Sequence, residues 1–253
     1  MINVEAASIA NASAQLKGND LDFFCRVWND SLEKYQKRLE AIDFKNQSCV
    51  LDAGFGMGQW TIPLAVHNKE LYGIEYSADR FEAVSKLIED LEITNANLQL
   101  GSIEDLPFDD NMFDAIFCYS VIFLTDYRRS LREFYRVLKP GGRVYFTLNG
   151  LGWYLYCLIE NHNKTENYNT RQIAANAIDS TFSALQGKPN PSGAQVIVTP
   201  AMLTDNLEEI GYQSYEIGSE GSLGQHIKGE SLSFYEEHEY LDHRMVYECI
   251  AVK

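Results

Sequence analysis

A glycine-rich turn follows the first run of buried-type apolar residues, in the stretch VLDAGFGMGQW at residues 50–60. Asp52 comes first, and glycines then stand at every second position, at Gly54, Gly56 and Gly58. Glycines let the backbone turn sharply and approach a ligand closely, next to the N-terminus of the following helix. A dinucleotide-binding turn would place its third glycine at position 59, which is Gln59. The spacing therefore favours a different ligand.

Further residues with binding chemistry follow in order along the chain. Glu75 ends the apolar run LYGIE, and a carboxylate there can accept hydrogen bonds from both hydroxyls of a ribose. Dinucleotide enzymes use the same device, so Glu75 alone does not discriminate between cofactors. The stretches GSIEDLPFDDNMFDAIF at residues 101–117 and RVLKPGGRVYF at residues 136–146 come next.

Taken together, these stretches resemble the class I S-adenosylmethionine-dependent methyltransferases, a seven-stranded and mostly small-molecule family. The first motif of that family is acid-x-G-x-G-x-G, and DAGFGMG fits it at every fixed position. Residues 101–117 resemble the stretch after the third strand of the family, and residues 136–146 resemble its turn before the fifth strand. The resemblance covers residues 45–150 and implies S-adenosylmethionine as cofactor and S-adenosylhomocysteine as product.

The resemblance also implies a set of cofactor-binding residues in this chain. They are Asp52, Gly54, Gly56, Gly58, Glu75, Ser102, Ile103, Glu104, Cys118, Tyr119 and Ser120. Two positions depart from the family pattern. Ser102 stands where an aspartate usually contacts the adenine amino group, a contact that Glu104 could make instead. Phe123 stands where the family often has a histidine, so no histidine role is carried over to it.

Periodicity predicts the elements that would position these residues. Short apolar runs alternate with helical patterns, which is typical of a parallel sheet covered on both faces. The expected strands are 48–53, 70–75, 98–100, 115–119, 143–148, 212–217 and 244–252. The expected helices are 20–42 with Asp20 as N-cap, 59–66, 78–91, 127–138, 151–160, 170–185 and one opening at Thr199-Pro200. Residues 1–19 are polar and aperiodic.

We therefore expect an α/β fold with three layers around a Rossmann-like sheet of seven strands, mostly parallel with the last antiparallel. An N-terminal helical segment (1–44) precedes the cofactor-binding core (45–150). A helical lid insertion (151–198) follows, and residues 199–253 complete the sheet, with a long loop at 218–243. The connections after the fifth and sixth strands start at the carboxyl edge of the sheet, where ligands bind. We expect them, with the N-terminal helix, to form a lid and an acceptor pocket.

The acceptor-side candidates are aromatic residues and one histidine. The pocket candidates are Trp28, Tyr35, Phe123, Trp153 and Tyr154, and His226 is the candidate base. A base is needed only if the attacking atom must lose a proton. His238 and His243 stand among acidic residues, but their spacing fits no helical ligand pair, so no metal is predicted.

Composition limits the partners. A formal net charge of -15 argues against a nucleic-acid binder, which needs a basic face. Five dispersed cysteines without a CxxC pair, and no secretory or membrane-spanning pattern, favour a cytoplasmic protein away from the membrane. The expected function is methyl transfer to an oxygen or nitrogen of a small molecule. A catalytically inactive binding or adapter protein is the alternative, and Gln59 disfavours a dehydrogenase; the oligomeric state is left open.

Overall fold

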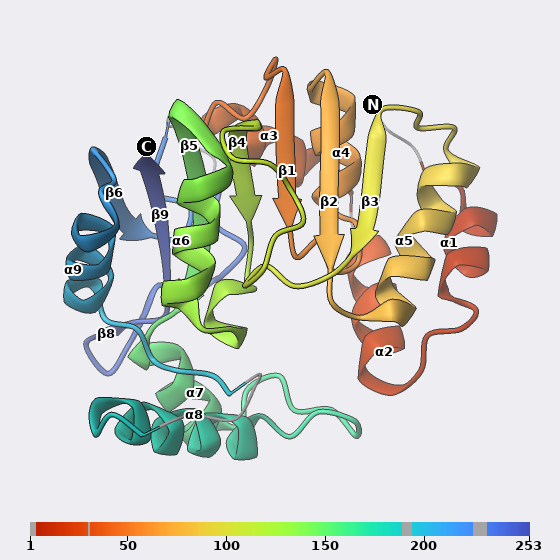
Figure 1. Ribbon diagram of the computed structural model, residues 1–253. Helices are drawn as coiled ribbons and strands as arrows, with labels where there is room; N and C mark the ends of the chain where they lie inside the picture. Colours follow the sequence, from red (N-terminus) through yellow and green to blue (C-terminus); the bar gives the residue numbers. More distant parts are fainter. Residues whose placement is uncertain (1–3, 30, 189–193, 225–231) are drawn as a thin grey trace.

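The computed structural model describes residues 4–29, 31–188, 194–224 and 232–253 (Figure 1). Its main sheet has seven strands in the order β3-β2-β1-β4-β5-β9-β6. They are β1 (Cys49–Ala53), β2 (Glu70–Glu75), β3 (Ala96–Leu100), β4 (Phe113–Cys118), β5 (Leu138–Asn149), β6 (Ser214–Ser219) and β9 (Val246–Val252). The first five pair in parallel, and β9 lies antiparallel between β5 and β6. The predicted fold class is confirmed.

Helices cover both faces of this sheet because each central strand is apolar on both sides. Val50 and Leu51 in β1 point to opposite faces, and neither is exposed. Leu51 belongs to the core beneath α6 (Tyr127–Val137) and α9 (Pro200–Ile210). Val50 belongs to the core beneath α2 (Gly18–Trp28), α3 (Glu33–Ala41), α4 (Thr61–His67) and α5 (Ala78–Asp90). Figure 1 shows the three resulting layers, with α6 in front of the sheet and α3 and α4 behind it.

The ends of α9 follow the sequence signals that predicted them. The Thr199 hydroxyl accepts the backbone N–H of Met202, Pro200 occupies the first turn, and Gly211 ends the helix with φ of 105°. This arrangement satisfies N-terminal donors with a side chain and uses glycine where the backbone becomes left-handed. The helix therefore begins and ends where its local sequence dictates.

The N-terminal prediction is wrong in two respects. Residues 6–13, expected to be irregular, form helix α1 (Ala6–Ser13), whose Asn11 side chain donates to Asp90 on α5. The single helix expected over 20–42 is divided into α2 and α3. The apolar spacing runs across the break because both helices bury their apolar faces in one core. Asp20 does not cap a helix; it lies in the first turn of α2 and accepts two hydrogen bonds from Arg80.

The insertion after β5 contains the predicted helices as α7 (Leu151–Glu160) and α8 (Thr170–Leu185). They share a small apolar core of Tyr154, Cys157, Ala174, Ala177 and Ile197. Figure 1 shows both helices beyond the arrowheads of β1, β2 and β4, which is the carboxyl edge of the sheet. The loop after β6 adds a hairpin of β7 (Glu239–Tyr240) and β8 (His243–Arg244). A search of the described segments finds no helix with the length and apolar character needed to cross a membrane.

Candidate cofactor and acceptor site

The glycine turn after β1 adopts backbone angles that favour glycine. Gly54, Gly56 and Gly58 have φ of 82°, 56° and 84°. A Cβ at Gly54 would lie 2.6 Å from the Val121 side chain, whereas a Cβ at Gly56 would meet nothing within 4 Å. Gly54 is therefore required by internal packing, and Gly56 faces open space where a ligand can approach the backbone.

Glu75 is joined to this turn. One oxygen of its carboxylate accepts the backbone N–H of Gly56 at 2.9 Å, and the other accepts the N–H of Ser77 at 2.9 Å. The residue is 7% exposed. A carboxylate has about four acceptor positions, so each oxygen retains one for a further donor. The end of β2 thus presents an oriented carboxylate beside the open face of the glycine turn.

Asp52, on β1, is buried more deeply than Glu75. Its carboxylate accepts the Thr61 hydroxyl at 2.8 Å, which ties the end of β1 to the start of α4. Burial raises the pKa of Asp52 to about 7, the Thr61 hydrogen bond acts in the opposite direction, and the charge of Glu75 raises the pKa further. Asp52 therefore changes charge near neutral pH, unlike an exposed aspartate.

Trp28 supports the same turn from the α2 side. Its indole nitrogen donates to the Met57 carbonyl oxygen at 3.0 Å, and the residue is 6% exposed. The ring is therefore a structural contact of the glycine turn. Two other predicted residues, Ile103 and Phe123, are buried in the core beneath α6, at 4% and 8% exposure. These three side chains offer little surface to a ligand.

The loop after β3 uses its polar side chains locally. The Ser102 hydroxyl accepts the backbone N–H of Glu104 at 3.2 Å. The Glu104 carboxylate accepts the N–H of Asp126 at 2.7 Å, and Asp126 is the N-cap of α6. Glu104 therefore connects this loop to the start of α6, and an adenine amino group would have to share its carboxylate.

The end of β4 brings three predicted residues to the carboxyl edge of the sheet. Cys118 is fully buried, and burial raises the pKa of its thiol far above the usual range. Ser120 has φ of 59° and donates its backbone N–H to the Thr147 hydroxyl at 2.8 Å. A serine held at this angle is strained, which is typical of functional sites. The Tyr119 hydroxyl donates to the Glu220 carboxylate at 3.1 Å.

Tyr119 belongs to a cluster of four aromatic rings. The other members are Tyr35, Trp60 and Phe234. Ring centroids are 4.8 Å apart for Tyr35 and Trp60, 4.8 Å for Tyr35 and Phe234, and 4.9 Å for Trp60 and Tyr119. The indole N–H of Trp60 is buried and makes no hydrogen bond to any described residue. Tyr35 is one of the predicted acceptor-pocket residues, whereas Trp60 was not predicted, although it follows the glycine motif by two residues.

The three segments expected to form a lid contact one another. The Asn167 amide, in the first insertion, donates to the Asp22 carboxylate of α2 at 3.1 Å. Trp153 of α7 lies edge-on to Tyr235 of the second insertion, with centroids 5.7 Å apart. Tyr154 is 1% exposed within the core that α7 and α8 share, so it supports this insertion from inside.

The histidine predictions have different outcomes. His226 lies outside the described residues. His238 and His243 are exposed, and among the described segments no group of three or more histidine, cysteine or acidic residues is arranged to hold a metal ion.

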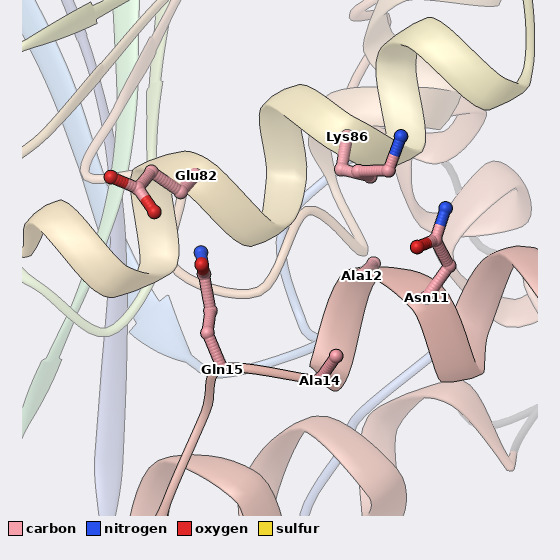
Figure 2. A pocket seen from close by; sticks show the side chains of 6 residues that line it. All are labelled: Asn11, Ala12, Ala14, Gln15, Glu82 and Lys86. Atoms are coloured by element: carbon pink, nitrogen blue, oxygen red, sulfur yellow. The ribbon is translucent and has the colours of Figure 1, made fainter.

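A separate pocket of about 310 Å³ lies between residues 11–15 and α5, as Figure 2 shows. It is lined by Asn11, Ala12, Ala14, Gln15, Glu82 and Lys86, none of which is a predicted site residue.

Comparisons with known proteins agree with this geometry. A family model described as a methyltransferase domain matches residues 51–146. A demethylmenaquinone methyltransferase of Bacillus mycoides is 32% identical over 113 residues, which are 43% of this chain and 48% of that protein. The ubiquinone/menaquinone biosynthesis C-methyltransferase UbiE of Geotalea daltonii is 30% identical over 130 residues, covering 49% and 55%. This chain spans about half the length of these curated relatives.

Solved structures share the fold of this chain. A chain of the complex between the Haloferax volcanii Trm112 methyltransferase activator and the putative methyltransferase matches with a TM-score of 0.60. The match covers 100% of this chain and 99% of that chain at 16% identity. At such low identity the likeness shows the fold alone.

Proposed function

Because this chain carries a methyltransferase domain of the class I S-adenosylmethionine-dependent family, we propose that it transfers the methyl group of S-adenosylmethionine to a small-molecule acceptor. One observation carries the cofactor assignment. The carboxylate of Glu75 is held by the N–H of Gly56, the glycine whose missing side chain leaves open space. A ribose on the free acceptor positions of Glu75 would lie directly against that backbone.

The ends of the neighbouring strands extend this binding surface. Tyr76 is 81% exposed and follows Glu75, and Leu100 is 54% exposed and pairs with Glu75 in the sheet register. Exposed apolar side chains at two adjacent strand ends offer a flat surface for an adenine ring. Sequence reasoning missed both residues, because their exposure depends on the helices and loops around them.

The methionine end would lie toward Asp52, Gly54 and Ser120. A carboxylate and a buried amide oxygen are suitable acceptors for an ammonium group, and the side-chain oxygen of Gln59 is buried without a partner among the described residues. The cofactor supplies an already activated methyl group. The residues of this chain therefore have to place the attacking atom in line with it and keep water away.

The acceptor would enter between the carboxyl edge of the sheet and the insertions. The net charge of -15 opposes a nucleic-acid acceptor. Oxygen or nitrogen is the attacking atom we propose, and the printed name of the UbiE relative, a C-methyltransferase, adds carbon to the atoms to be tested. All five cysteines are free and four are buried, which suits the cytoplasm, where we place the protein.

Calorimetry with S-adenosylhomocysteine, NAD and ATP tests the cofactor assignment on the wild type and on Glu75→Ala. We expect only S-adenosylhomocysteine to bind, and the substitution to weaken it strongly. Methyl release from S-adenosylmethionine with phenol, amine and hydroquinone acceptors then separates an enzyme from an adapter. Binding without turnover of any acceptor would support the adapter, and absence of binding would overturn the proposal.

A further inference from the structure

Glu220 is a buried carboxylate at the start of the second insertion. It is 1% exposed and accepts three hydrogen bonds: from the Tyr119 hydroxyl at 3.1 Å, the Ser233 hydroxyl at 2.6 Å and the Phe234 N–H at 3.0 Å. Within the described segments it forms no ion pair. A buried carboxylate without a paired cation is costly, so a role for it is expected.

Glu248 provides the contrast inside the same fold. It is also fully buried and also accepts a tyrosine hydroxyl, that of Tyr145 at 2.9 Å. However, Glu248 forms an ion pair with the buried guanidinium of Arg38, which also donates to the Leu223 carbonyl oxygen at 2.7 Å. Glu248 is therefore accounted for by charge pairing, whereas Glu220 has no such pair among the residues that the structure describes.

Hydrogen bonds lead from Glu220 to the acceptor side of the site. The Tyr119 hydroxyl donates to Glu220 directly. Burial raises the pKa of Tyr235 to about 12, and side-chain hydrogen bonding with Ser120 and Tyr119 acts in the opposite direction. Tyr235 is partly exposed and lies edge-on to Trp153 of α7. The route thus runs from the junction of the two insertions to the buried carboxylate.

We propose that Tyr235 and Tyr119 pass a proton from a hydroxyl group of the acceptor to Glu220. The acceptor is accordingly a hydroxylated aromatic or enolic molecule, for which the partly exposed ring of Phe234, packed on Tyr35 and Trp60, offers an apolar surface. This inference rests on the proposed methyl transfer and names its acceptor class. It replaces a histidine base with a tyrosine pair and a carboxylate.

The proton and electron balance is complete. The attacking atom forms a bond to the methyl carbon, the sulfur–methyl bond breaks, and its electron pair stays on sulfur, which becomes a neutral thioether. The acceptor hydroxyl proton moves to the Tyr235 oxygen, the Tyr235 proton moves to Tyr119, and the Tyr119 proton moves to Glu220. The positive charge of the sulfonium and the negative charge of the carboxylate are both lost.

The electrostatics around Glu220 fit an acceptor of protons. Burial raises the pKa of Glu220, the hydrogen bonds from Ser233 and Phe234 lower it, the charge of Glu248 raises it and that of Arg38 lowers it. Burial and then Glu220 hold the pKa of the Tyr119 hydroxyl well above its usual range. Tyr119 therefore stays neutral and transmits a proton without ionising.

The test uses 4-nitrophenol, whose phenolate is yellow, bound to protein saturated with S-adenosylhomocysteine. At a pH where the free probe is mostly neutral, we expect the wild type to bind it as phenolate. Glu220→Gln should still bind the probe but lower the ratio of phenolate to phenol in the bound probe by about tenfold, since tenfold in that ratio corresponds to one pKa unit. Tyr145→Phe is the matched control, because it removes a buried hydroxyl from Glu248, and it should retain the phenolate.

An equal phenolate signal in Glu220→Gln and the wild type would overturn the relay, as would equal loss in the Tyr145→Phe control. Failure of the probe to bind a wild type that does bind S-adenosylhomocysteine would overturn the acceptor class and leave the cofactor assignment standing. Failure of S-adenosylhomocysteine itself to bind would overturn both. If Glu220→Gln does not fold, Tyr235→Phe at the partly exposed end of the route gives the same readout.

Discussion

The carboxylate of Glu75 and the backbone N–H of Gly56 are 2.9 Å apart, so the ends of β2 and β1 form a single binding unit. The two residues are separated by 19 positions in the chain and meet because β1 and β2 are parallel neighbours. An acid at this place fixes the turn and also presents free lone pairs to a ligand. Loss of the acid should therefore affect binding more than folding.

Glu75→Gln should weaken S-adenosylhomocysteine binding by roughly ten- to a hundredfold, since a hydrogen bond to a charged group contributes about 1.5–3 kcal/mol. The amide retains one oxygen for the Gly56 N–H but places donors where the ribose hydroxyls also donate. Calorimetry measures the change. Glu216→Gln, at an exposed position on β6, is the matched control and should bind as the wild type does.

Two glycines of the same turn should respond differently to alanine. Gly54→Ala places a methyl group 2.6 Å from Val121 at positive φ, which should lower the free energy of unfolding by about 2–4 kcal/mol. Gly56→Ala meets nothing within 4 Å, so only the backbone cost of about 1–2 kcal/mol applies. Its methyl group would instead occupy the ligand face. Urea unfolding and calorimetry on both variants separate the two effects, and equal binding by Gly56→Ala and the wild type would contradict this assignment.

The sheet was predictable from sequence because its signals are local. Buried parallel strands read as continuous apolar runs, and the turns between them carry glycine or a capping side chain. The break between the N-terminal helices α2 and α3 was not predicted, because the local apolar pattern gives no sign of it. Apolar spacing continues from Trp28 to Leu32 across the break between α2 and α3, since both residues face one core at 6% exposure.

The acceptor side depended on contacts that no local pattern contains. Tyr119 and Glu220 are 101 positions apart, and no sequence motif at either residue predicts their contact. Trp28 illustrates the opposite error, because an aromatic residue near the site was expected to face an acceptor. Its indole instead hydrogen-bonds the glycine turn. Residue type predicted that these side chains lie near the site, but it did not predict which way each side chain points.

Tyr76→Ala should weaken S-adenosylhomocysteine binding by roughly five- to a hundredfold, because stacking of a base on an aromatic ring contributes about 1–3 kcal/mol. Tyr76 is 81% exposed, so the free energy of unfolding should change by less than about 0.5 kcal/mol. Phe182→Ala on α8, where Phe182 is 62% exposed, removes an exposed ring elsewhere and should leave binding unchanged. Unchanged binding in Tyr76→Ala would remove this residue from the adenine site.

The stability of the ligand-free protein should depend on pH through Asp52. Burial raises its pKa from 3.8 to about 7 in the folded state, so the folded protein holds a proton that the unfolded chain has released. Stability from this group therefore falls as pH rises between those two values, by up to about 4 kcal/mol at 1.36 kcal/mol per pKa unit. Asp52→Asn cannot ionise and escapes this loss, while its amide still accepts the Thr61 hydroxyl.

Urea unfolding of both proteins at about pH 5 and about pH 8 measures the effect, because the difference between them isolates Asp52 from other titrating groups such as Glu220. The variant should gain stability relative to the wild type at the higher pH. The same substitution should weaken S-adenosylhomocysteine binding at that pH, since the ammonium end of the ligand loses a carboxylate partner. A stability difference that does not change with pH would mean that Asp52 ionises as freely in the folded chain as in the unfolded one.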